Sequence, residues 1–115
     1  MSEDCIFCKM VSGEIKPDIV YETDNVLAFR DLNPQAPTHV LLIPRQHIAT
    51  LDELQEADSD LIGEIVLAAT EVARKEGIAE RGYRLVVNHR ADGGQTVFHL
   101  HYHLLGGRVM NWPPG

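Results

Sequence analysis

The sequence predicts an α+β domain built on a mainly antiparallel sheet. Three observations lead to this fold class: five short β-rich runs, turn-forming residues between them, and one long amphipathic segment after the third run. Strands that follow one another through short turns pair antiparallel, and an inserted helix can cover one face of the resulting sheet. With 115 residues, the chain has the length of one ordinary domain, so we expect residues 1–115 to fold as a single unit.

The first third of the chain predicts a short helix and a hairpin. Residues 5–12, CIFCKMVS, place apolar side chains at helical spacing, and Gly13 is expected to end this helix. Two β-rich runs follow, DIVYE at 18–22 and NVLAFRD at 25–31, with turn-favouring residues where they meet. We expect them to pair as neighbouring strands.

The middle of the chain predicts a loop, a central strand and the main helix. Residues 32–39, LNPQAPTH, contain two prolines and predict a loop, whereas the apolar run VLLIP at 40–44 predicts a strand covered on both faces. The TLDE stretch at 50–53 matches the Thr-x-x-Glu signature of a capped helical turn.

The long helix is expected from about Asp58 to Glu76. Basic residues occupy its last turn and Gly77 follows as a cap, so both stop signals agree. Its apolar stripe is predicted to consist of Leu61, Ile62, Ile65, Val66, Ala69, Val72 and Ala73.

The last third predicts two more strands. YRLVVNH at 83–89 is β-rich, RADGGQT at 90–96 contains the glycines of a turn, and VFHLHYHLLGG at 97–107 is expected to return as a strand. The prolines of NWPPG at 111–115 end regular structure.

Charge and hydropathy exclude two classes of partner. The net charge of −7 argues against binding a nucleic-acid polymer, which needs clustered lysine and arginine side chains. A small phosphate ester is compatible with this charge, because local N–H groups can hold it. The first residues lack the pattern of a signal peptide, and no apolar run approaches the length of a membrane span. We therefore expect a cytoplasmic protein with no membrane partner.

Three histidines alternate with apolar residues in HLHYH, residues 99–103. On a strand they would share one face, and the outer two would be about 13 Å apart. One zinc ion, with Zn–N bonds of ~2 Å, could bind at most two of them. Three interpretations remain: a polar face with incidental histidines, a metal site that uses His99 and His101, and catalysis by His101 between two histidines that tune it. The last accounts best for the strict alternation.

The chemistry of imidazole suits attack on a phosphorus centre. A neutral ring with one nitrogen held as N–H leaves the other nitrogen free to attack, and an adjacent protonated histidine could then deliver a proton to the leaving group. The preceding DGGQT segment, residues 92–96, would offer successive N–H groups of Gly93 and Gly94 and the side chains of Gln95 and Thr96 to a phosphate. The residues thus indicate phosphoryl or nucleotidyl transfer through a phosphohistidine-type intermediate.

The chain has only two cysteines, Cys5 and Cys8, one helical turn apart. They could give two thiolates to a zinc ion, for which His47 and His99 are candidate further ligands. Two buried thiols without a metal are the other interpretation. A redox pair fits less well, because the βαβ context of a thioredoxin motif is missing.

The HLHYHLL run, residues 99–105, resembles the His-x-His-x-His-x-x signature of the histidine triad superfamily. FRDLNPQAPTHVLLIPRQHI, GYRLVVN, DGGQTVFHLHYHLLGGR and the terminal WPPG resemble its branch of nucleotide-binding proteins over nearly the whole chain. The resemblance implies a five-stranded sheet with one long and one short helix, continued across a homodimer. It implies a purine nucleoside phosphoramidase, a hydrolase that needs no catalytic cofactor.

The resemblance also implies roles for individual residues. His101 would attack the α-phosphate, His103 would contact the phosphate, and His39 would join their proton network. Asp31 would hold the ribose hydroxyls. The base pocket would be lined by Ile6, Phe7, Met10, Phe29 and Leu32, and the phosphate and leaving group would be surrounded by Asn88, Gly94, Gln95 and Thr96. For Ile6 and Met10, simple core packing is an equally good interpretation.

A subset of that superfamily binds structural zinc through a Cys-x-x-Cys, a histidine after the IP strand and the first triad histidine. The resemblance therefore implies a zinc site of Cys5, Cys8, His47 and His99. Two other functions stay open: a dinucleoside polyphosphate hydrolase or nucleotidyl transferase of the same superfamily, and a nucleotide-binding regulatory or scaffold protein. The LLGGR stretch at 104–108 resembles the phosphoramidase branch better than the other enzymes.

Overall fold

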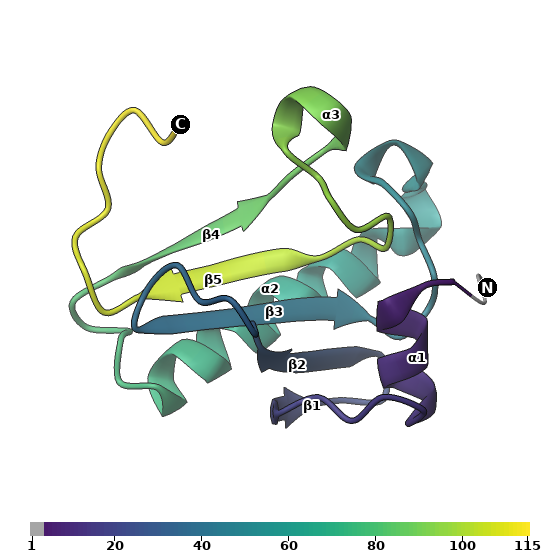
Figure 1. The fold of residues 1–115 in the computed structure, drawn as a ribbon, viewed down its shortest axis with the longest axis horizontal. Helices are drawn as coiled ribbons and strands as arrows, with labels where there is room; N and C mark the ends of the chain where they lie inside the picture. The colour runs from purple at the N-terminus through teal and green to yellow at the C-terminus, as the bar shows by residue number, and fades with distance from the viewer. Residues whose placement is uncertain (1–3) are drawn as a thin grey trace.

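The computed structural model describes residues 4–115 and contains a five-stranded antiparallel sheet (Figure 1). The strand order is β1-β2-β3-β5-β4, so the last strand of the chain is inserted between β3 and β4. The strands are β1 (Ile19–Glu22), β2 (Val26–Arg30), β3 (Thr38–Pro44), β4 (Tyr83–Val87) and β5 (Tyr102–Gly106). The α+β class and the antiparallel sheet are as the sequence predicts.

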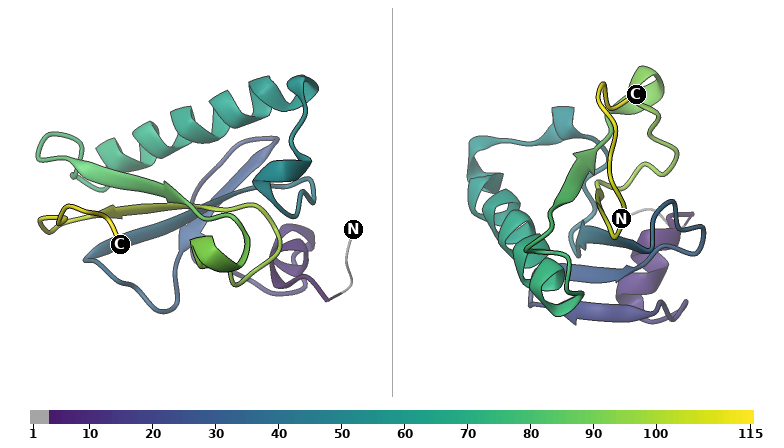
Figure 2. Two further views of the ribbon diagram at one scale, coloured as in Figure 1. Left: turned by 90° about the horizontal axis from the view of Figure 1, so that it is seen from above. Right: turned by 90° about the vertical axis from the view of Figure 1, so that its left-hand side faces the viewer.

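The long helix lies across one face of the sheet, and the short N-terminal helix packs at the end of the opposite face (Figures 1 and 2). The helices are α1 (Ile6–Ser12), α2 (Ser59–Lys75) and α3 (Arg90–Gly93), and two 3-10 turns, η1 (Leu51–Glu53) and η2 (Glu56–Asp58), precede α2. Gly13 ends α1 with a φ of 86°, as expected for a glycine that closes a helix.

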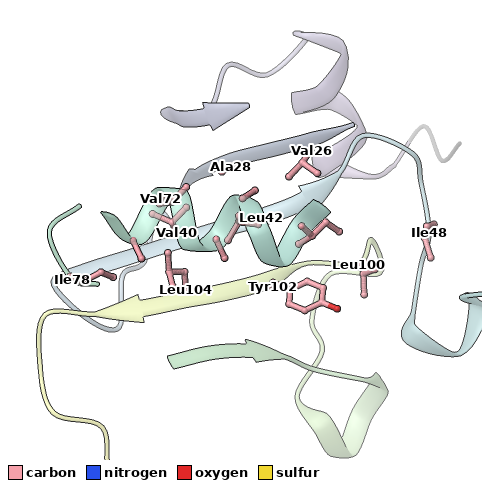
Figure 3. Close-up of a cluster of buried hydrophobic side chains, with 14 residues drawn as sticks. Val26, Ala28, Val40, Leu42, Ile48, Val72, Ile78, Leu100, Tyr102 and Leu104 are labelled. Carbon is pink, nitrogen blue, oxygen red and sulfur yellow. The ribbon is translucent and has the colours of Figure 1, made fainter. Parts of the chain in front are cut away.

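The main core lies between α2 and the sheet (Figure 3). Val26 and Ala28 of β2 and Val40 and Leu42 of β3 face the helix because alternate residues of a strand point to the same side. From α2, the buried apolar residues are Ile65, Ala68, Ala69, Val72 and Ala73. Val66 is an exception to the predicted stripe, since its side chain is 39% exposed.

The residues between these positions form a second, smaller core on the opposite face. Leu27 and Phe29 of β2 and Leu41 and Ile43 of β3 pack against Phe7, Cys8 and Met10 of α1. This face also carries His39, because His39 alternates with Val40 along β3. The N-terminal helix is therefore held beside the histidines by apolar contacts.

The predicted strand at 97–107 is wrong in its first half, because β5 begins only at Tyr102. In the register of β3 with β5, Leu42 pairs with Tyr102, and continuing this register by two residues would place Leu100 opposite Pro44, the residue that ends β3. Proline has no N–H for the ladder, and the N–H of Leu100 instead donates to the carbonyl of Ile48. Leu100, Tyr102 and Leu104 nevertheless all enter the main core, so the alternation of side chains survives without regular pairing.

Three further boundaries differ from the sequence predictions. Strand β3 begins at Thr38, so His39 belongs to the sheet rather than to the preceding loop. Thr50 makes no side-chain capping bond, and the capping box is formed by Gln55 and Asp58 instead. The glycine-containing turn at 90–96 includes the single helical turn α3.

Within residues 4–115, no helix is long and apolar enough to cross a membrane.

Candidate functional site

Two groups of metal- or proton-binding side chains lie on the sheet face opposite α2 or at its edge. The first, which we call the thiol–imidazole cluster, consists of Cys5, Cys8, His47 and His99. The second, the carboxylate–imidazole cluster, consists of Asp31, His39 and His103. In each group one ligand-type atom from every residue lies within 4.8 Å of the others. His101 lies next to both clusters, because its ring lies beside the tilted ring of His103 and its Nδ1 contacts the backbone of His99.

The thiol–imidazole cluster joins three distant parts of the chain. Cys5 Sγ lies 3.3 Å from His99 Nδ1, and Cys8 Sγ lies 3.2 Å from His47 Nδ1. The two Nδ1 atoms are 3.2 Å apart, and Cys8 Sγ lies 3.6 Å from His99 Nδ1. His99 and both cysteines are buried. Helix α1 supplies Cys8 and is preceded by Cys5, so its first turn sets the spacing of the two thiols.

These separations match the edges of a tetrahedral zinc site. With Zn–S of about 2.3 Å and Zn–N of about 2.0 Å, tetrahedral angles give ligand separations of about 3.5 Å for sulfur to nitrogen and about 3.3 Å for nitrogen to nitrogen. The Nε2 of His99 lies 2.8 Å from the carbonyl oxygen of Pro44, which can only accept, so Nε2 carries the proton. The lone pair of Nδ1 is then directed into the cluster, as a metal ligand requires. The donor set fits zinc in chemistry, number and geometry.

The ring of His101 is fixed by the backbone carbonyl of His99. Its Nδ1 donates to this oxygen at 2.8 Å, and the neutral ring therefore has its lone pair on Nε2. His101 is buried, and Phe7 packs edge-on against its ring with centroids 5.2 Å apart. Phe7 makes a similar contact with His99 at 5.8 Å. A fixed, neutral imidazole with a free Nε2 is a nucleophile that needs no separate base.

The carboxylate–imidazole cluster lies on β3, β5 and the segment after β2. His39 Nε2 is 2.9 Å from His103 Nδ1 and 3.4 Å from Asp31 Oδ2. In the register of β3 with β5, Leu41 pairs with His103, so His39 and His103 are diagonal neighbours on one face. The second oxygen of Asp31 accepts from the N–H of Asn33 at 2.8 Å, which holds the carboxylate in place.

Burial keeps these imidazoles neutral. It lowers the pKa of His103 to about 4, an effect that the neighbouring His101 and His39 increase. Burial also lowers the pKa values of His39 and His101, although the negative charge of Asp31 raises both in part. For His99, burial lowers the pKa to about 4. At neutral pH the four rings therefore have lone pairs available for binding or attack.

The residues predicted to hold a nucleoside divide into buried and exposed groups. Phe7 and Phe29 are buried and contact each other edge to face with centroids 5.5 Å apart, and Met10 is buried in the same core. Ile6 and Leu32, in contrast, are 41% and 91% exposed. Exposed apolar side chains beside polar groups are what a flat ligand covers. Ile6 and Leu32 are therefore accessible to a ligand, whereas Phe7 and Phe29 are not, and the predicted contacts of all four with a base stay predictions.

The predicted phosphate-binding segment is only partly available. The N–H groups of Gly94 and Gln95 already donate to the carbonyls of Ala91 and Arg90, because α3 closes a helical turn there. The side-chain amide of Gln95 is buried, accepts from the N–H of Arg90 and donates both of its hydrogens to the carbonyls of Ala49 and Val97.

This arrangement corrects the prediction for Gly94 and Gln95: the Gly94 N–H is used within the turn, and the Gln95 side chain joins this segment to the loop before η1. The predicted contact of the Gly93 N–H with a phosphate stays a prediction. Thr96 is exposed and Asn88 half-buried, and their predicted contacts with the phosphate and leaving group stay predictions.

Two of the hollows in the described surface bear on the position of the site. One of about 460 Å³ adjoins the thiol–imidazole cluster and brings Ile6 and Thr96 to a common cleft. The other, of about 500 Å³, lies at the opposite end of β4 and β5 and is lined by Arg81, Arg84 and Arg108 among others. The second hollow contains none of the predicted site residues. We place the site at the histidines because the fixed nucleophile and both clusters are there.

Sequence reasoning missed the backbone groups of the site. The carbonyls of Pro44 and His99 and the N–H of Gln35 each hold one histidine ring. No residue type marks such groups, because every peptide unit carries them. The proline at the end of VLLIP was the available signal, since it stops the strand and leaves its own carbonyl free to turn toward His99.

Comparison with known proteins agrees with this geometry. The family model of the HIT domain matches residues 12–110. A purine nucleoside phosphoramidase of Escherichia coli is 49% identical over 110 residues, which are 96% of this chain and 92% of that protein. An uncharacterized HIT-like protein of Synechococcus elongatus is 55% identical over the full length of both chains.

Solved structures of other proteins are also similar to this chain in fold and in sequence. A HIT family hydrolase from Legionella pneumophila has a TM-score of 0.95 at 54% identity, with 97% of this chain and 100% of that chain covered. A histidine triad protein from Clostridium difficile has a TM-score of 0.93 at 42% identity, with 96% of each chain covered. Sequence, fold and the arrangement of its histidines agree: this chain belongs to the HIT family.

Proposed function

We propose that this chain is a hydrolase that cleaves the P–N bond of purine nucleoside 5′-phosphoramidates and releases a nucleoside monophosphate and an amine. The single observation that carries the proposal is His101, a buried imidazole whose Nδ1 is tied to the carbonyl of His99 and whose Nε2 is free. The name of the Escherichia coli relative, 49% identical, supports the choice of substrate.

The reaction proceeds in two displacements at phosphorus. In the first, His101 Nε2 forms a bond to the α-phosphorus as the P–N bond breaks, and the departing amine takes a proton from water. In the second, the resulting hydroxide or a further water attacks phosphorus and releases His101. The sum is the addition of one water across the P–N bond. Such covalent catalysis replaces one difficult step by two easier ones.

The surrounding residues bind and orient the nucleotide. His103 is adjacent to His101, with ring centroids 5.0 Å apart, and supports the phosphate. Asp31 accepts from the ribose hydroxyls, as a carboxylate does. Ile6 and Leu32 contact the purine over the rings of Phe7 and Phe29, while Thr96 and Asn88 contact the phosphate and leaving group. No catalytic cofactor takes part.

The test uses three substrates and two variants. Purified protein is incubated with adenosine 5′-phosphoramidate, with a diadenosine polyphosphate, and with a nucleotide sugar plus a sugar phosphate. We expect turnover of the first and at least about a hundredfold loss in His101→Ala. His89→Ala is the matched control, because His89 is the one histidine outside both clusters and His101.

The other outcomes decide between functions. Preferential turnover of the diadenosine polyphosphate or of the sugar exchange would assign the chain to those reactions instead. Nucleotide binding without turnover of any substrate would indicate a regulatory or scaffold protein. Equal rates in the wild type and His101→Ala would contradict the proposed mechanism.

We further propose that Cys5, Cys8, His47 and His99 hold a structural zinc ion. When bound, zinc would add a cross-link between α1, the segment after β3 and the histidine segment. The support is the near-tetrahedral spacing of the ligand atoms and the hydrogen bond from His99 Nε2 to the Pro44 carbonyl, which orients the ring. Elemental analysis of protein purified without added zinc is expected to give close to one zinc per chain, and a value near zero would remove this proposal.

A homodimer that continues the sheet is the third part of the proposal. Strand β4 is at one edge of the sheet and pairs with β5 on one side only. An open edge of this kind is a template for pairing with another chain. Light scattering of the purified protein is expected to give twice the mass of the 12.8 kDa chain, and a monomer at micromolar concentration would contradict the homodimer.

A further inference from the structure

The segment between β2 and β3 directs one backbone N–H into the site. The N–H of Gln35 points at Nδ1 of His39, with nitrogen atoms 3.0 Å apart. A backbone amide can only donate, so Nδ1 of His39 must present its lone pair. In the neutral ring the proton is then on Nε2, the atom that faces the carboxylate–imidazole cluster.

This tautomer determines the next one. His39 Nε2, now a donor, lies 2.9 Å from His103 Nδ1, which must therefore accept. Asp31 Oδ2 is a more distant acceptor for the same N–H at 3.4 Å. His103 is left with its own proton on Nε2, the only ring nitrogen that His39 does not occupy. The backbone N–H of Gln35 thus determines the tautomer of His39 and, through His39, that of His103.

A cation at either ring would break this series. If His39 were doubly protonated, its Nδ1–H would face the N–H of Gln35 at 3.0 Å, donor against donor. If His103 were doubly protonated, its Nδ1–H would face the N–H on His39 Nε2. The direction in which burial shifts both pKa values is consistent with this exclusion.

Residue 35 is itself held by the segment that follows β5, whose last residue pairs with the first residue of β3. The guanidinium of Arg108, just after β5, donates to the Gln35 carbonyl at 3.1 and 3.2 Å. The side chain of Gln35 donates to the carbonyl of Asn33. These bonds keep the exposed segment in the conformation that points its N–H inward, although the Gln35 side chain does not touch His39.

We infer that the backbone N–H of Gln35 fixes His39 as the Nε2–H tautomer. His39 in turn fixes His103 as a neutral ring that presents its Nε2–H to the substrate. His39 is then a positioning residue and not a proton carrier. His103 keeps its proton throughout and donates a hydrogen bond to a phosphoryl oxygen, while the leaving amine takes its proton from water. This inference rests on the proposed function for its substrate. The role belongs to the backbone N–H of residue 35 and not to its side chain.

The first test removes the amide hydrogen alone. Gln35→Pro has no N–H at this position but keeps the carbonyl that Arg108 binds, whereas Gln35→Ala keeps both groups. With adenosine 5′-phosphoramidate, we expect kcat to fall at least about tenfold in Gln35→Pro with little change in KM, because an incorrect tautomer weakens the transition state. Gln35→Ala should stay within about twofold of the wild type. Equal kcat values in the two variants would overturn the inference.

The second test separates positioning from proton transfer. Glutamine at position 39 places an amide N–H near the position of Nε2 and cannot carry a proton between groups. His39→Gln should therefore retain kcat within about tenfold, and His39→Phe should lose far more. If both variants lose activity equally, His39 is a proton carrier and the inference is wrong. This pair also decides the matter if Gln35→Pro does not fold.

The third test needs no substrate. Nitrogen-15 NMR of histidine-labelled wild-type protein at pH 7 should show His103 neutral with its proton on Nε2, and Gln35→Pro should shift this ring toward a mixture of tautomers. A cationic His103, or one protonated on Nδ1, would overturn the inference. Because the spectrum is recorded without nucleotide, it can be decided even if no phosphoramidate is cleaved, an outcome that would count against the proposed function alone.

Discussion

The thiol–imidazole and carboxylate–imidazole clusters each contain two histidines, but backbone hydrogen bonds direct the lone pairs of these histidines differently. In the first, His99 donates its Nε2–H to the Pro44 carbonyl, so the lone pair of His99 Nδ1 points into the cluster toward the other ligand atoms. In the second, the backbone N–H of Gln35 donates to His39 Nδ1, and His39 Nε2–H donates to His103 Nδ1, so donors and acceptors alternate from one residue to the next. A centre of convergent lone pairs suits a cation, and an alternating line suits a defined proton position. The backbone partner, more than the residue type, decides which of the two a histidine cluster becomes.

The largest expected effect comes from opening the first cluster. Cys8→Ser removes one thiol from the cross-link between α1 and the rest of the site, and we expect zinc to be lost and the free energy of unfolding to fall by several kcal/mol. Elemental analysis and chemical denaturation measure the two effects. His103→Asn, in the other cluster, should keep its zinc. Zinc retained in Cys8→Ser would show that the two clusters differ less than their geometry indicates.

A smaller effect on stability but a clear one on turnover is expected from the second cluster. His103→Asn removes the ring nitrogen that we propose as a donor to the phosphate, and loss of one such donor typically lowers kcat by about a hundredfold or more. Single-turnover kinetics with adenosine 5′-phosphoramidate should place the loss in formation of the nucleotidyl intermediate. Normal turnover together with zinc loss would exchange the roles of the two clusters.

Much of this site could be predicted from the sequence, because its side chains lie in recognisable runs. The alternation in HLHYH correctly separates the histidines from Leu100, Tyr102 and Leu104, which enter the main core. The Cys-x-x-Cys turn correctly places two thiols beside His47 and His99. In both cases a local spacing determines the direction of the side chains.

Other features depend on groups far away in the chain or on the backbone. Strand β5 begins late because of the proline that ends its neighbour β3, which no pattern within 97–107 contains. The sequence alone suggests Gln95 as a donor to a phosphate, but both hydrogens of its side-chain amide are donated to the carbonyls of Ala49 and Val97. The tautomer of His39 depends on a peptide N–H that any residue except proline would supply.

Acid should destabilise the second cluster through its neutral rings. Burial lowers the pKa of His103 to about 4, below the value of 6.5 that an exposed histidine has. Between these two values the unfolded chain binds more protons than the folded one, so the free energy of unfolding should fall as the pH drops from about 6.5 to about 4. Chemical denaturation at several pH values should give a shallower slope for His103→Asn than for the wild type at equal zinc content. Identical slopes would mean that His103 is not held neutral.

The smallest expected effect tests the charge that distinguishes the second cluster from the first. The negative charge of Asp31 raises the pKa values of His39, His101 and His103, and so partly opposes the effect of burial. Asp31→Asn keeps an oxygen for the Asn33 N–H but removes the charge, so all three pKa values should fall further in an NMR titration. Asp18→Asn is the control, because the Asp18 carboxylate pairs with Arg30 at 3.6 Å instead. Since the tautomers of His39 and His103 are set by the Gln35 amide, they should stay unchanged in Asp31→Asn; a tautomer change there would make the carboxylate, and not the amide, the group that orders the line.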